Sequence, residues 1–181
     1  MIATAPKQLS MDLRIPQECP LLPVKAVICL LSRCGVVSGE DVTELIDNGQ
    51  LEYAFDLRRP GAGHALPVVW RGSLADFMAR QDDSGESGPH LRILNGVSDL
   101  EQVIDDVLPG HVQGSKFGGE SIRAVQLKTC FGFCDRKHVI RLIADGALAV
   151  DPARPVGRGP SQSPWVTRAS AAQFLRDRRI V

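Results

Sequence analysis

The chain has 181 residues, of which 44% are hydrophobic and 23% are charged, and its formal net charge is zero. This length and composition predict one or two small globular domains with a buried core. The longest apolar stretch, Leu21 to Leu31, contains Pro23 and Lys25 and is far shorter than the roughly 20 apolar residues of a membrane-spanning helix. The N-terminus does not resemble an export signal, so we expect a soluble, cytoplasmic protein.

The zero net charge hides two parts of opposite sign. Residues 1–120 carry 10 Lys and Arg against 17 Asp and Glu, whereas residues 121–181 carry 11 against 4. Such an asymmetry is typical of proteins whose two parts bind different partners, and the basic part is a candidate for binding a polyanion.

The first predicted domain covers residues 20–81. Its second helix has Ser38 as the expected N-cap and carries Val42, Leu45 and Ile46 at the i, i+3 and i+4 spacing of a buried helix face. The expected elements, in chain order, are a helix over 24–33, the helix after Ser38, a strand at Leu51, a strand over 68–70 and a helix over 73–80. The two strands form a hairpin with a Pro/Gly/Arg-rich tip.

Residues 82–120 are expected to form a linker that contains one helix. Ser98 and Glu101 have the spacing of a capping box, and an apolar stripe follows them, which predicts a helix near 98–108. Because the opposite face of this helix is acidic, we expect it to be a spacer or to bind a partner protein.

The second predicted domain, residues 121–181, repeats the first. An ungapped shift of 97 residues gives about 13 identities in 48 aligned positions, mostly where an apolar face or a turn needs them. Asp135 takes the place of Ser38 as N-cap, and Gly146 takes the place of Gly49 at the end of the second helix. We therefore expect an α+β, mainly helical fold with two copies of one unit.

Each unit has the order helix, turn, helix, hairpin and closing helix. The first copy reads VTELIDNGQL and then VWRGSLADFM, and the second reads VIRLIADGAL and then VTRASAAQFL. These segments resemble the excisionase and MerR-like DNA-binding domains, including small phage regulators of the AlpA type. The resemblance covers residues 24–80 and 121–178 and implies two tandem winged helix-turn-helix domains. The hairpin tip at 154–163 is longer than in the smallest members of that family.

The resemblance assigns double-stranded DNA to the second copy. In a helix-turn-helix the second helix enters the major groove, and flanking cations bind phosphates. Arg and Lys are suited to both tasks, because Arg binds guanine through two hydrogen bonds and both neutralise phosphate. The candidate DNA-binding residues are Arg136, Lys137, His138, Arg141, Arg154, Arg158 and Arg168. A solvated basic face without a partner is the alternative.

The first copy presents carboxylates at the corresponding positions. They would repel phosphates, so we expect this copy to bind protein instead, through a surface made of Glu40, Asp41, Glu44 and Asp47. Its task is dimerisation, docking to a basic protein such as a recombinase or RNA polymerase, or screening of the basic half. A purely structural role is equally open.

Enzymatic chemistry is not indicated by the sequence. Cys134 and His138 lie four residues apart, but no second pair with ligand spacing supports a zinc site. The five cysteines form an odd set without a Cys-x-x-Cys pair, which indicates reduced thiols. We expect no metal, no cofactor and no catalytic residues.

Two functional hypotheses follow. The first is a sequence-specific DNA-binding homo-oligomer, acting as a transcriptional regulator or as an excisionase-like directionality factor of a mobile element. The second is an adaptor whose winged helices bind proteins.

Overall fold

The computed structural model describes residues 19–82, 96–108, 120–133, 135–154 and 163–180. They form an α+β fold in which about half of the described residues are helical and the strands are short and antiparallel. The first repeat contains β1 (Leu21–Pro23), α1 (Val24–Leu31), the 3-10 turn η1 (Ser32–Cys34), α2 (Gly39–Asp47), β2 (Ala54–Asp56), β3 (Pro67–Trp70) and α3 (Arg71–Asp82). The second repeat contains β4 (Ser121–Arg123), α5 (Ala124–Cys130), α6 (Arg136–Ala144), β5 (Trp165–Thr167) and α7 (Arg168–Asp177), and α4 (Gly96–Val107) lies between the repeats in sequence.

Both repeats build a small sheet around one central strand. In the first repeat β3 lies between β1 and β2, and Leu22 pairs with Val69. In the second repeat β5 pairs with β4 on one side and, through Val166, with a single bridge residue, Val150, on the other. The first strand of each expected hairpin differs from the expectation: the strand expected at Leu51 begins at Ala54, and its counterpart in the second repeat is only the single bridge residue Val150. β1 and β4 were not anticipated because three residues are too few for a periodic pattern.

The two repeats differ in length at their first helix. Val27 and Leu31 are fully buried in α1, and the residues with the same burial in and after α5 are Leu127 and Phe131, which corresponds to a shift of 100 residues. The ungapped shift of 97 instead pairs Leu127 with Leu30, which is 37% exposed. The turn η1 accounts for the difference, because it adds three residues to the first repeat before the chain reaches the glycine that ends the turn.

Helix α4 confirms the helix expected near 98–108, but it is not a free spacer. Val103, Ile104 and Val107 are buried in the same hydrophobic cluster as α5, α6 and α7. On the rim of this contact, Arg176 of α7 donates two hydrogen bonds to the carboxylate of Glu101, at 2.7 and 2.6 Å. The acidic face that suggested a partner-binding helix therefore faces, in part, arginines of the same chain.

A single hydrophobic core joins the two repeats. Leu21, Tyr53, Phe55 and Leu57 of the first repeat are buried in the cluster that also holds the second repeat and α4. A second cluster, built around α1, α2 and α3, belongs to the first repeat alone. The repeats are separated in sequence by residues 82–120. The shared core nevertheless contains residues from the first repeat, from α4 and from the second repeat.

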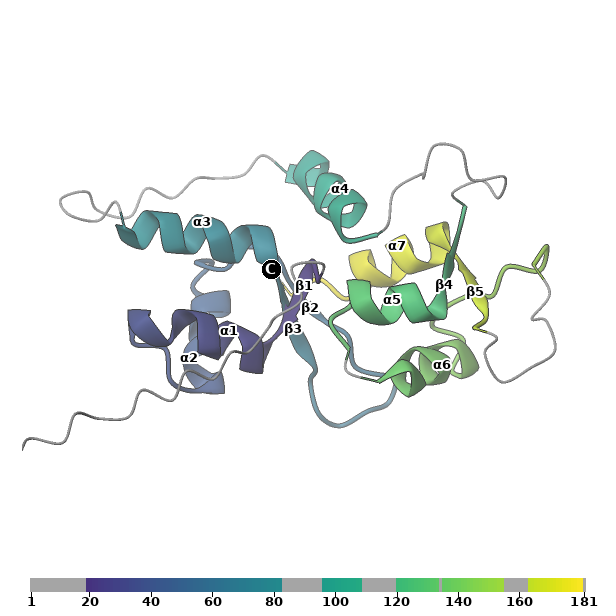
Figure 1. Ribbon diagram of the computed structural model, residues 1–181, viewed down its shortest axis with the longest axis horizontal. Helices are drawn as coiled ribbons and strands as arrows, with labels where there is room; N and C mark the ends of the chain where they lie inside the picture. The colour runs from purple at the N-terminus through teal and green to yellow at the C-terminus, as the bar shows by residue number, and fades with distance from the viewer. Residues whose placement is uncertain (1–18, 83–95, 109–119, 134, 155–162, 181) are drawn as a thin grey trace, which may run out of the picture.

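The segment after α7 extends the sheet of the first repeat. The backbone N–H of Asp56 donates to the carbonyl of Arg178 at 2.8 Å, and that of Ile180 donates to the carbonyl of Ala54 at 2.8 Å. Phe55 and Arg179 form an antiparallel bridge between these bonds. The outer edge of β2 is therefore covered by the other repeat, and Figure 1 shows β1, β2 and β3 between the helices of the two repeats.

Gly132 provides a test of this seam. Its φ of 68° is left-handed, as is the φ of 85° at its counterpart Gly35. A Cβ on Gly132 would collide with the backbone carbonyl of Leu21, whereas a Cβ on Gly35 would meet no atom within 4 Å. Gly35→Ala should cost about 1–2 kcal/mol for the left-handed backbone alone, and Gly132→Ala should cost clearly more because it also separates the repeats.

Thermal or urea unfolding of the two variants measures this difference. Equal losses of stability would show that the close approach of Gly132 to Leu21 does not contribute to holding the repeats together.

Candidate nucleic-acid interface

The N-cap of α6 and the buried side chains on its inner face fix the rotation of this helix about its own axis. The Oδ1 atom of Asp135, the expected N-cap, accepts a hydrogen bond from the backbone N–H of Lys137 at 2.9 Å. Val139 and Leu142 are fully buried in the shared core. Because side chains at i and i+3 share a helix face, this burial decides which residues of α6 face outward.

The outward face of α6 is basic. Lys137 and Arg141 lie one turn apart and are exposed, and Arg136 is partly exposed beside them. Together with Asp135 and Ile140 they line a shallow depression of about 500 Å³. Within the described part of the chain, no hydrogen bond or ion pair engages the side chain of Arg136 or Lys137, so their positive charge is uncompensated there.

His138 differs from its neighbours, because it faces the first repeat. Its imidazole is half-buried and packs on Phe133 with the ring centroids 4.3 Å apart. Nε2 lies 3.0 Å from the carbonyl oxygen of Leu57. A carbonyl only accepts hydrogen bonds, so Nε2 donates. His138, expected on the exposed reading face, thus contacts the hairpin of the other repeat.

The same hairpin holds the C-terminal end of α6. Arg59, in the connection between β2 and β3, donates from Nε and Nη2 to the two carboxylate oxygens of Asp145 at 2.7 and 3.0 Å. These hydrogen bonds from Arg59 lower the pKa of the Asp145 carboxyl below its ordinary value, and the nearby positive charges lower it further. One flank of α6 is therefore occupied by the first repeat, and its basic face is left open.

The ion pair predicts a pH dependence of stability. A carboxyl whose pKa is lowered in the folded state stabilises that state above its unfolded pKa, and the contribution is lost as the pH falls through the folded pKa. Arg59→Gln should therefore reduce stability at pH 7, and the loss should shrink only as the pH falls through the lowered pKa of Asp145, where the wild-type carboxylate also becomes protonated.

Urea unfolding between pH 7 and pH 3 tests this expectation, with Asp145→Asn as the control. In the Asp145→Asn background the Arg59→Gln change should have the same effect at every pH. A pH-dependent effect that persists there would assign the titration to another group.

Arg168 and Arg154, which were also expected at DNA, have partners within the protein. Arg168 donates to the carbonyl of Leu108 at 3.1 Å and to Asp105 at 2.7 Å, so it fastens α4 to α7. Arg154 lies 3.6 Å from the carboxylate of Asp151 and its side chain is 18% exposed. Arg158 lies outside the described residues, as does Cys134.

Helix α2 presents the opposite charge on the same frame. Glu40 and Glu44, which the 97-residue shift pairs with Lys137 and Arg141, are exposed, and so is Asp47. Asp41 has a structural task instead, because its carboxylate accepts hydrogen bonds from the backbone N–H groups of Val37 and Ser38, both at 2.8 Å. These bonds lower the pKa of Asp41. The acidic surface thus consists of the three exposed carboxylates of Glu40, Glu44 and Asp47, and Asp41 instead completes a capping box.

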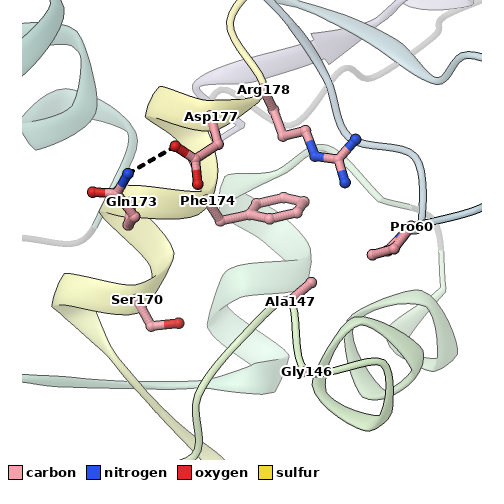
Figure 2. Close-up of a pocket in the computed structure, with 8 residues that line it drawn as sticks. All are labelled: Pro60, Gly146, Ala147, Ser170, Gln173, Phe174, Asp177 and Arg178. Carbon is pink, nitrogen blue, oxygen red and sulfur yellow. Dashed lines mark hydrogen bonds between the residues drawn. The ribbon is translucent and has the colours of Figure 1, made fainter.

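A pocket of about 540 Å³ lies on the seam between the repeats (Figure 2). Pro60 of the first repeat faces Phe174 and Arg178 of the second across this pocket, and Ser170 lies at its edge. The hydroxyl of Ser170 accepts a hydrogen bond from the backbone N–H of Ala149 at 2.7 Å. This pocket is the space that remains where the β2–β3 connection crosses the second repeat, and it brings together no nucleophile and base.

The thiols and carboxylates of the described chain form no recognisable reaction centre. Cys19, Cys29, Cys34 and Cys130 are not joined in disulfide bonds. Burial raises the pKa of the Cys130 thiol to about 11, so it is protonated and unreactive at neutral pH. Among the described residues no cluster of three His, Cys, Asp or Glu side chains has the geometry of a metal site, and no helix is long and apolar enough to cross a membrane.

Two contacts of the second repeat were not expected from the sequence, although Arg154 itself was expected at DNA. One is the seam contact of Arg59 and Leu57, which gives no local signal because its partners are far away in the chain. The other is a cluster at the sheet of the second repeat, where Arg123 and Arg154 stack on Trp165 at 4.8 and 4.4 Å from the ring centroid. A tryptophan near arginines in a strand is the signal that points to it.

Comparison of the chain with protein-family models, with characterised proteins and with solved structures finds no match.

Proposed function

We propose that the protein binds double-stranded DNA sequence-specifically through its second repeat, as a winged helix-turn-helix. The observation that carries this proposal is the outward face of α6, where Arg136, Lys137 and Arg141 are presented side by side on a helix whose rotation is fixed by buried residues. Helix α5, a short turn, α6 and the strand pair that ends in β5 follow in the order of that domain type. Such a helix fits the major groove, where arginine and lysine recognise guanine.

The comparison of the two repeats supports the same assignment. If the charges on the second helix of each repeat served only solubility, positive and negative residues could be mixed on its exposed face. Instead the exposed positions are basic in α6 and acidic in α2, with Glu40 in place of Lys137 and Glu44 in place of Arg141. Because phosphates attract only the second pattern, DNA binding belongs to one repeat and leaves the other for a different partner. The resulting role is a transcriptional regulator or a directionality factor of a mobile element.

Removal of the reading face tests the proposal. A good guanine contact contributes about 1–3 kcal/mol, so Arg136→Ala with Arg141→Ala should weaken the binding of a specific fragment by about 30-fold or more. The measurement is an electrophoretic mobility shift on genomic fragments at two salt concentrations, because specific retention must also weaken steeply with salt.

The matched control removes two exposed cations from the first repeat, through Lys25→Ala with Arg33→Ala. This variant should bind the fragment almost as the wild type does. Retention that survives the α6 changes, or that is lost equally with the control, would contradict the assignment of α6 as the reading helix.

For the first repeat we propose a role in assembly, carried by the exposed carboxylates Glu40, Glu44 and Asp47. They form a surface that suits a basic protein face, either on a second copy of the chain or on a partner such as a recombinase or RNA polymerase. This observation also favours the adaptor function as the second candidate, in which both repeats bind proteins and DNA is not a ligand.

Neutralising the acidic surface separates assembly from DNA binding. Glu40→Gln with Glu44→Gln should lower the oligomer mass seen by light scattering, or abolish partner capture, since the attraction is electrostatic. The affinity for DNA should stay within about twofold, because charges farther away than a Debye length of roughly 8 Å are screened. Unchanged assembly in this variant would remove the carboxylates from the interface.

A further inference from the structure

The sheet of the second repeat carries a cluster of two arginines on one tryptophan. Arg123 ends β4 and Trp165 begins β5, and the two are direct cross-strand partners in the antiparallel register. The guanidinium carbon of Arg123 lies 4.8 Å from the centroid of the indole, and that of Arg154 lies 4.4 Å from it. The name Arg-Trp-Arg cluster refers to these three residues.

The two arginines differ in their charge balance. Arg154 is paired with Asp151, whose carboxylate also accepts a hydrogen bond from the hydroxyl of Ser121, and that bond is the main cause of the lowered pKa of Asp151. Arg123 is exposed, and no carboxylate of the described residues pairs with its guanidinium. Stacking on the indole restricts the conformations of Arg123, so less conformational entropy is lost when it binds an anion.

The first repeat shows that the fold itself does not require this cluster. The register pair equivalent to Arg123 and Trp165 is Pro23 and Val68, which carries no charge and no aromatic ring. The tryptophan of the first repeat, Trp70, packs edge-on against Tyr53 with the ring centroids 5.7 Å apart, in the seam. The Arg-Trp-Arg cluster is therefore particular to the repeat that has the basic helix.

The position of the cluster fits a second contact with the same ligand. The β4–β5 sheet lies at the same end of the molecule as α6, whereas α1, α2 and α3 lie at the other end (Figure 1). A guanidinium group matches the geometry of phosphate oxygens and can donate two hydrogen bonds to them. A duplex that lies in contact with α6 has phosphates along both sides of its major groove.

We propose that Arg123, held by Trp165, binds a backbone phosphate of the DNA duplex whose major groove α6 enters. This inference rests on the proposed DNA-binding function and adds a contact that positions the duplex without reading its sequence. Arg123 is the residue that touches the phosphate, and Trp165 is a positioning residue.

The salt dependence of binding tests the proposal. Each phosphate neutralised on B-DNA contributes about 0.9 to the slope of log K against log salt concentration. Arg123→Gln should therefore reduce the slope by about 0.9 and should weaken specific and random duplexes by the same factor. Arg123→Lys should keep the slope, since the charge remains. Trp165→Leu should also keep the slope but should weaken binding, because Arg123 is no longer held in place.

Lys25→Gln is the matched control, as it removes one exposed cation from the start of α1 in the first repeat and should leave the slope unchanged. Circular dichroism confirms that each variant is folded. A slope in Arg123→Gln equal to that of the wild type, with DNA retained by both, would overturn the phosphate contact alone. Absence of retention by the wild-type protein at low salt would overturn the proposed function, and the phosphate contact with it.

Discussion

The burial of the first repeat's sheet against the helices of the second is the contact on which the other features of the molecule depend. Leu21, Phe55 and Leu57 have no exposed surface, and each buries apolar area that a separate domain would leave in water. Because interiors are closely packed, this contact fixes the position of the β2–β3 connection and of the segment after α7. The ion pair of Arg59 and the hydrogen bond of His138 lie on the rim of this contact and act on a geometry that the core has already set.

The contact between the repeats determines which surfaces of each copy are exposed and can therefore differ between them. The hairpin of the first repeat packs on the second repeat, and it is no longer available to a ligand in the way that the β5 sheet is. Helix α2 lies away from the seam, so its outer face was free to change charge without loss of packing. Under the proposed function, Glu40 and Glu44 of α2 and Lys137 and Arg141 of α6 would face different partners. Val42, Ile46, Val139 and Leu142 are buried and serve the core that both repeats share in pattern.

Much of the architecture is predictable from local patterns in the sequence. Apolar residues at helical spacing locate α2, α4 and α6, the caps Ser38 and Asp135 act as expected, and the glycines after each turn have the left-handed backbone that the repeat implied. The three-residue strands and the turn η1 are too short to leave a periodic signal. The roles of Arg168 and His138 were not predictable, since a cation on a helix looks the same in sequence whether it meets water or a carbonyl from another element.

The backbone pairing of residues 178–180 with β2 also bears on how the chain matures. The outer edge of β2 is made early in translation, but the segment that covers it emerges only after the whole second repeat has been synthesised. Until then the nascent first repeat has an open strand edge and an uncovered apolar sheet face, the two features that recruit chaperones and promote misassembly. Folding of the first repeat is thus coupled to the arrival of the segment that follows α7, so that neither copy reaches its final form ahead of the other.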